Sequence, residues 1–190
     1  MNPAYTPGGS RVRAFFGLPV PEAVREELEP YLAACAATAP QFRWVPPDNL
    51  HLTIRFIGSV EQALVEDIAG RLAARPPKPF ELAVGGLGTF KRGRLVRVIS
   101  FELSAGAEPA RALAAQVEAE CARAGLVAEK RPFHPHLTLA RARAQEGAAL
   151  PPLPDAPRLE PWPADELLLY RSRLGRAGSV YEPLRIIQLS

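Results

Sequence analysis

Cysteine and histidine are both scarce in this chain. Its 190 residues include only two cysteines and three histidines. That excludes a disulfide scaffold, a zinc-finger framework and a multi-histidine metal cage, because each of these needs more ligands. We therefore expect neither a metal nor a cofactor. Cys35 and Cys121 lie in alanine-rich, helix-like stretches and are interpreted as buried free thiols, with a redox or nucleophilic role as the alternative.

Long hydrophobic runs are missing as well. No stretch of about 18 apolar residues occurs, and the first residues, MNPAYTPGGS, lack the basic and apolar parts of a signal peptide. We expect a cytoplasmic protein with no membrane partner. The length of 190 residues predicts one domain, and the hydrophobic share of 47 % predicts that it is folded. We expect this domain over residues 11–190, preceded by a flexible arm over residues 1–10, and we expect a monomer.

Lysine is the third residue type in short supply. The chain has 20 arginines and 3 lysines, and its formal net charge is +3. Abundant alanine and proline suggest that genomic base composition contributes to this bias. Arginine nevertheless grips phosphate with a planar, forked group, so a phosphate-bearing partner remains open.

The residue pattern predicts strands that alternate with helices. Apolar residues recur at every second position in the expected strands and at helical spacing in the expected helices. Pro30 should kink or split the first helix, Ser59 and Gln62 should form a capping box, and the proline-rich residues 151–163 should form an extended loop. The expected strands cover residues 11–18, 50–58, 80–84, 94–103, 131–141, 166–174 and 180–189, and the expected helices cover residues 24–35, 62–72 and 108–125.

Two short segments of the chain are almost the same. Residues 51–54 read HLTI and residues 136–139 read HLTL. They are 85 residues apart, since 136 − 51 = 85, which is close to half the chain. Each follows a helix-containing stretch, so the spacing indicates a weak internal duplication.

The first of these motifs divides its strand into two faces. Alternate residues of a strand point to the same side, so His51, Thr53 and Arg55 should share one face. The other face should carry the apolar side chains Leu52, Ile54 and Phe56. The polar face must look into water or a cleft.

The second motif divides its strand in the same way. His134, His136 and Thr138 should share the polar face, opposite the apolar residues 133, 137 and 139. His134 stands between Phe133 and Pro135 and is interpreted as a structural or exposed residue. Arg141 either binds phosphate or lies on the opposite face of the strand; both readings stay open.

Two such motifs facing one another would suit phosphoryl transfer. The pKa of an unperturbed imidazole is about 6.5, so one imidazole can accept a proton while the other donates one. Threonine hydroxyls and guanidinium groups can hold the non-bridging phosphate oxygens. A single such motif would more often be a solvent-facing pair without a role, but here two of the three histidines occur in matching motifs.

These segments resemble a known family. LHLTIRFIG at residues 50–58 and RPFHPHLTLAR at residues 131–141 are similar to the signature segments of the two-histidine phosphoesterases. Within that superfamily they look most like RNA 2′,3′-cyclic phosphodiesterases, formerly called 2′-5′ RNA ligases. The likeness extends from RAFFGLPVPEAVREEL to LYRSRLGRAGSVYEPL, with one departure at Arg97, where relatives usually have tryptophan.

The resemblance implies a fold, a reaction and a set of site residues. The fold would be α+β and bilobal, with two pseudo-symmetric antiparallel sheets backed by helices and the active groove between them. The reaction would be metal-free hydrolysis of a 2′,3′-cyclic phosphate to a 2′-phosphomonoester, on RNA or a nucleotide. His51 would be the proton donor and His136 the proton acceptor. The expected substrate-binding residues are Thr53, Thr138, Arg55 and Arg141.

Two other functions remain open at this point. The same groove could run the reaction backwards and ligate a 2′,3′-cyclic end to a 5′-hydroxyl, although dilute aqueous solution favours hydrolysis. Alternatively, the fold could serve as an RNA-end-binding module with little turnover, whose salt-dependent affinity for RNA would survive loss of both histidines.

Overall fold

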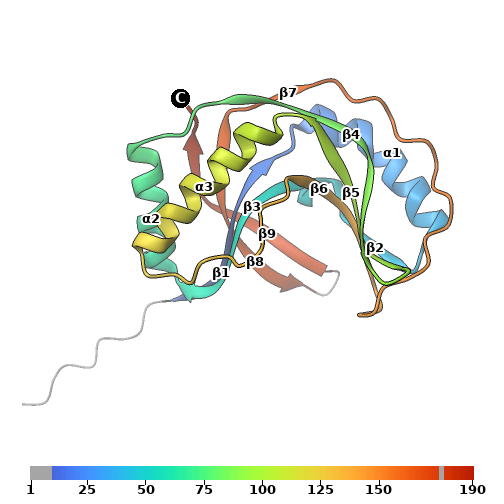
Figure 1. Cartoon of the computed structure of the whole chain (residues 1–190), viewed down its shortest axis with the longest axis horizontal. Coiled ribbons are helices and arrows are strands. Elements are labelled where there is room, and N and C mark those ends of the chain that lie inside the picture. Colours follow the sequence, from blue (N-terminus) through green and yellow to red (C-terminus); the bar gives the residue numbers. More distant parts are fainter. Residues whose placement is uncertain (1–9, 176–177) are drawn as a thin grey trace, which may run out of the picture.

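The computed structural model describes residues 10–175 and 178–190 and builds them from two antiparallel sheets and three α-helices (Figure 1). The arm expected over residues 1–10 lies, apart from Ser10, outside the described residues. The centre of the turn expected between Gly175 and Gly178 lies outside them too.

The expected strands and helices are present, with shifted ends. The strands are β1 (Arg11–Pro19), β2 (Phe42–Trp44), β3 (His51–Glu61), β4 (Phe80–Arg92), β5 (Leu95–Ala105), β6 (His136–Ala142), β7 (Trp162–Ala164), β8 (Glu166–Gly175) and β9 (Gly178–Gln188). The helices are α1 (Glu22–Thr38), α2 (Gln62–Ala74) and α3 (Ala107–Arg123), with a short 3₁₀ turn η1 (Pro47–Asn49) before β3.

The two sheets confirm the α+β architecture. The first sheet has the strand order β3-β1-β8-β9 and the second has the order β2-β6-β5-β4-β7. Each paired strand runs antiparallel to its neighbour. The first sheet joins strands from both ends of the chain, so the two sheets are interleaved in sequence and do not correspond to two halves of it.

The helices cover the sheets on opposite sides of the molecule (Figure 1). Helix α1 packs on the second sheet, where the ring of Tyr31 lies 6.0 Å from that of Phe101 in β5. Helices α2 and α3 contact each other and the first sheet. Cys35 and Cys121 are buried free thiols, as expected. Burial raises the pKa of the Cys121 thiol to about 11, which keeps it protonated at neutral pH.

The strand that carries the second motif is shorter than expected. It begins at His136, whereas the pattern placed its start at residue 131. Pro132 and Pro135 explain the difference, because proline donates no backbone hydrogen bond to a sheet. His134 therefore lies outside the strand and is exposed, in agreement with its interpretation as a structural or exposed residue.

Three smaller expectations are corrected. Ser59 forms no capping box, because β3 continues to Glu61 and α2 begins only at Gln62. Pro30 does not split α1, which runs through it while Leu28 and Leu32 on either side stay buried. The proline-rich segment is not loop throughout, since its end enters β7, which pairs with β4 and forms the edge of the second sheet.

Candidate active site

Both motif histidines occupy the first position of their strands. His51 begins β3, an edge strand of the first sheet, and His136 begins β6 of the second sheet. The two strands contact each other where the sheets meet. The chain thus brings the two motifs, 85 residues apart in sequence, to one place.

The two imidazoles are held in the same way. Nδ1 of His51 lies 2.7 Å from the carbonyl oxygen of Asn49, and Nδ1 of His136 lies 2.7 Å from that of His134. A carbonyl oxygen only accepts, so each Nδ1 carries the hydrogen and donates it to the residue two positions earlier. In the neutral ring Nε2 is then left without a proton and is the nitrogen available for proton transfer.

Thr53 is in contact with Nε2 of the histidine in the first motif. Its Oγ1 lies 3.0 Å from Nε2 of His51. The hydroxyl donates to Nε2 while the imidazole is neutral and accepts from it once the imidazole is charged. Thr138 shares the face of His136, as the cross-strand partners of both residues on β5 show.

Aromatic rings enclose His51. The centroid of Phe15 is 4.7 Å from that of the imidazole, and the Tyr181 ring stands edge-on to it at 5.1 Å. A Cβ atom added at Gly17 would come within 3.3 Å of His51 Cδ2, so this glycine leaves room for the ring. The imidazole can therefore change its orientation only slightly.

Burial controls the ionisation of His51. Its pKa is lowered to about 4, chiefly by the loss of hydration and to a smaller extent by the charges of Arg141 and the neighbouring His136, against the raising effect of the Asn49 carbonyl. In the ligand-free protein His51 is consequently neutral at pH 7.

His136 has a more mixed environment. Burial is the largest effect and lowers its pKa, and the charges of His134 and Arg141 act in the same direction. The carboxylate of Glu102, its cross-strand partner on β5, opposes them and raises the pKa. A negative group thus supports the charged form of the second imidazole.

Glu102 and Phe90 complete the surroundings of His136. The side chain of Glu102 lies across Gly88, where an added Cβ would be 2.8 Å from its Cγ and Oε1 atoms. The Phe90 ring is 4.7 Å from the imidazole of His136, centroid to centroid, and is partly exposed. The glycine therefore makes space for a carboxylate beside the second imidazole.

A β-bulge corrects the expected position of Arg55. Thr53 pairs with Gly17 of β1 and Arg55 pairs with Phe16, the next residue of β1, so β3 has one extra residue between the two pairs. The extra residue interrupts the alternation, so Arg55 lies on the face of the fully buried Phe16 and not on that of His51. The expectation that Arg55 shares the polar face of its motif is wrong.

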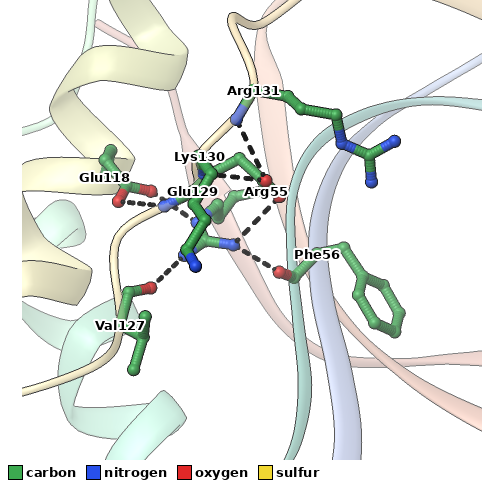
Figure 2. Close-up of polar contacts among 7 residues, drawn as sticks. All are labelled: Arg55, Phe56, Glu118, Val127, Glu129, Lys130 and Arg131. Atoms are coloured by element: carbon green, nitrogen blue, oxygen red, sulfur yellow. Dashed lines mark hydrogen bonds and ion pairs between the residues drawn. The ribbon is translucent and has the colours of Figure 1, made fainter.

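The guanidinium of Arg55 is instead engaged with α3 and the segment that follows it (Figure 2). Its Nε donates to Glu118, and its Nη1 and Nη2 each donate, at 2.7 Å, to the carbonyl oxygens of Phe56 and Val127 respectively. Glu129 adds an ion pair at 3.8 Å. Arg55 thus ties the first motif to the segment that leads into the second.

A second β-bulge has the opposite effect on Arg141. Thr138 pairs with Ser100 of β5 and Ala140 pairs with the adjacent Ile99, so β6 has one extra residue between the two pairs. Arg141 therefore points to the same side as His136 despite the odd spacing between them. Its positive charge lowers the pKa of both His51 and His136. Of the two positions that the sequence left open, the structure shows the face of the histidines.

Four residues of this site carried no signal in the sequence. Phe15 and Tyr181 come from β1 and β9, far from either motif, and Glu102 and Phe90 come from the β4–β5 hairpin. Only the pairing of strands places them around the histidines, so no spacing rule within one segment could have found them.

The histidines do not line the pocket beside α1. A pocket of about 610 Å³ lies between the first turn of α1 and β7, with Trp162 and several prolines in its wall and neither histidine. Within residues 10–175 and 178–190, no helix is long and apolar enough to span a membrane. In the same part of the chain, no three metal-ligating side chains gather into a group that could hold an ion.

Two antiparallel sheets that bring paired His-x-Thr strands together define the class of two-histidine phosphoesterases, and the sequence agrees with this assignment. The chain matches the LigT like phosphoesterase family over residues 18–99 and 102–181 and belongs to it. The resemblance stated from the two motifs is confirmed.

Relatives of known name cover most of the chain. The sequence is 33 % identical to an RNA 2′,3′-cyclic phosphodiesterase of Escherichia coli (strain K12), over 91 % of this chain and 94 % of that protein. It is 36 % identical to one from Aeropyrum pernix over 57 % of this chain and 61 % of that protein. The crystal structure of E. coli LigT complexed with 3′-AMP superposes with a TM-score of 0.80, at 28 % identity, over 95 % of this chain and 99 % of that one.

Proposed function

We propose that this chain is an RNA 2′,3′-cyclic phosphodiesterase, which hydrolyses a 2′,3′-cyclic phosphate at the end of RNA or of a nucleotide to a 2′-phosphomonoester. The observation that carries the proposal is the matched pair of imidazoles, each with Nδ1 bound to a carbonyl oxygen two residues back. Family membership and relatives with this activity support it. A cytoplasmic enzyme acting on nucleotide or RNA ends is the setting we propose.

In the proposed reaction, one imidazole takes a proton from water as the water oxygen attacks phosphorus. The bond from phosphorus to O3′ breaks, and the other imidazole gives its proton to O3′. The phosphate remains on O2′. Thr53, Thr138 and Arg141 are proposed to hold the non-bridging oxygens, where donors on a shared face stabilise the charge that develops in the transition state.

We assign the proton donor to His51 and the acceptor to His136, as the resemblance implies. With a pKa of about 4 in the ligand-free protein, His51 needs the negative charge of the bound phosphate to hold a proton at neutral pH. The carboxylate of Glu102 beside His136 favours the reverse assignment before substrate binds. The pair is therefore proposed independently of the direction in which it works.

The proposed activity is tested with purified protein and a panel of 2′,3′-cyclic mononucleotides and oligonucleotides. Phosphorus NMR should show a 2′-phosphomonoester as the product, and the rate should not change when a chelator is added. Joined RNA as the major product would support ligation instead. Salt-dependent RNA binding without turnover, unchanged in His51→Asn and His136→Asn, would support a binding module.

The donor and acceptor roles are distinguished with a phosphodiester whose leaving group is a nitrophenol. Such a leaving group departs without a proton, so the variant that lacks the donor should recover activity on this substrate relative to the cyclic nucleotide. We expect recovery in His51→Asn and none in His136→Asn. Recovery in His136→Asn alone would reverse the assignment while preserving the pair.

A further inference from the structure

The arginines of this protein fall into two groups. Those of the first sheet and the helices mostly have carboxylate partners, as in the pairs Arg11–Glu61, Arg71–Glu120 and Arg171–Glu182. In the second sheet, the described residues hold a different arrangement at the end away from His136. There, cations gather without such partners.

Two arginines stand directly opposite one another at this end. Arg43 of β2 pairs across the strands with Arg141 of β6, so both side chains point to the same face. Neither forms an ion pair with a carboxylate of the described chain. Like charges in this position destabilise a sheet, so an anion that binds both would relieve a repulsion already present.

The β4–β5 hairpin continues the positive surface. On the other side of β6, Arg141 pairs with Val98, and the exposed Arg97 is the extra residue of a bulge next to Val98. The tip adds three further exposed cations, and no acidic residue occurs from residue 89 to residue 101. Glu146 is the carboxylate in the loop that returns to β5 at Ala148. The cations of the tip are Lys91, Arg92 and Arg94.

We infer that Arg43, Arg97 and the hairpin tip form a binding strip for the phosphodiester groups on the 5′ side of the cyclic phosphate. This inference rests on the proposed function, because the histidines mark where the 3′-terminal nucleotide lies. Arg141 belongs to both places: it stands on the face of the histidines and next to Arg43. A polynucleotide whose end is at the histidines can therefore continue onto the strip, whereas a mononucleotide has nothing to place there.

The strip favours a single-stranded RNA end over a cyclic mononucleotide as the substrate. A guanidinium forms charge-assisted hydrogen bonds with a phosphodiester, and each adds to affinity. The preference should be sensitive to salt, because a single strand releases counterions when it binds. In a plot of log affinity against log salt concentration, each phosphate contact contributes a slope of about −0.7.

The test compares kcat/KM for a 2′,3′-cyclic mononucleotide with that for a short oligonucleotide carrying the same terminal base. The wild-type protein should prefer the oligonucleotide at low salt. In Arg43→Gln the ratio of the two values should fall about tenfold, the equivalent of one charge-assisted hydrogen bond. The salt slope for the oligonucleotide should become shallower by about 0.7.

Arg75→Gln is the matched control, because Arg75 is exposed at the end of α2, away from the second sheet. It should leave both the ratio and the salt slope unchanged. Equal losses on both substrates in Arg43→Gln, or no loss, would overturn the binding strip while leaving the proposed function intact. A wild-type protein that hydrolyses neither substrate would instead overturn the proposed function, and the strip with it.

Discussion

At the scale of single residues, the site depends on how each imidazole is held. The Nδ1 hydrogen bonds of His51 and His136 to backbone carbonyls fix one tautomer and leave Nε2 without a hydrogen in the neutral ring, as the proposed reaction requires. Burial lowers the pKa of both rings, so in the ligand-free protein at pH 7 both are mainly without the proton that one of them donates in the proposed reaction.

This gives a prediction for the pH dependence of kcat/KM, which reports the ionisation of the free enzyme. One histidine must be charged and the other neutral, so the profile should be a bell. The pKa values of both histidines are lowered, that of His51 to about 4. The alkaline limb of the kcat/KM profile should therefore lie below the usual histidine pKa of about 6.5. The alkaline limb of the kcat profile should lie at a higher pH than that of the kcat/KM profile, because bound phosphate stabilises the imidazolium. A kcat/KM profile that stays level up to pH 8 would contradict this account.

Glu102→Gln tests the carboxylate beside His136. Removing the negative charge should lower the pKa of His136 and move the alkaline limb of kcat/KM to lower pH, with little effect on stability. Gly88→Ala should move it in the same direction, because the added methyl group displaces the Glu102 side chain. Glu160→Gln, in the pocket beside β7, is the control. An alkaline limb that does not move in Glu102→Gln would show that this carboxylate has no influence on the pair.

At the scale of elements, two β-bulges decide which arginine meets the histidines. The motif strands read HLTIR and HLTLAR, and strict alternation would place Arg55 with the histidines and Arg141 away from them. The bulges reverse both positions. Bulges depend on the pairing of two strands and leave no mark in one strand's own residues, so parity alone could not have predicted either result.

The sequence did predict most of the elements and the family. Alternation and helical spacing located the three helices and all the strands except the short β2 and β7, and the repeated motif located both histidines, because these signals are local to each segment. The sheet order, the interleaving of the sheets and the neighbours Phe15, Tyr181 and Glu102 arise from contacts between distant segments. The residue pattern within one segment does not predict such contacts.

Arg55→Gln tests whether Arg55 stabilises the fold. Only 11 % of its side chain is exposed, and the substitution leaves Glu118 without its partner. We expect the free energy of unfolding to fall by about 2–3 kcal/mol, measured by denaturant unfolding, with KM for the cyclic nucleotide nearly unchanged.

The control for this measurement is Arg75→Gln, an exposed arginine whose replacement should cost less than about 0.5 kcal/mol. If Arg55→Gln kept full stability and raised KM selectively, Arg55 would belong to the substrate site after all.

At the scale of the whole molecule, the interleaved sheets explain how one small chain builds a two-sided site. The first sheet takes strands from both ends of the sequence, and β3 and β6 meet where the two sheets come together. Each sheet contributes one imidazole to the same place. A change that separated the sheets would therefore remove the site while leaving each motif intact.

The measurement that tests the central claim most directly is the rate of 2′-phosphate formation from a 2′,3′-cyclic nucleotide by the wild type, His51→Asn, His136→Asn and the double variant. Residues that act as one acid–base pair give non-additive losses. The rate should fall about 10²–10⁴-fold in each single variant. In the double variant it should be scarcely lower than in the less active single variant. Single variants with near wild-type rates would contradict the account.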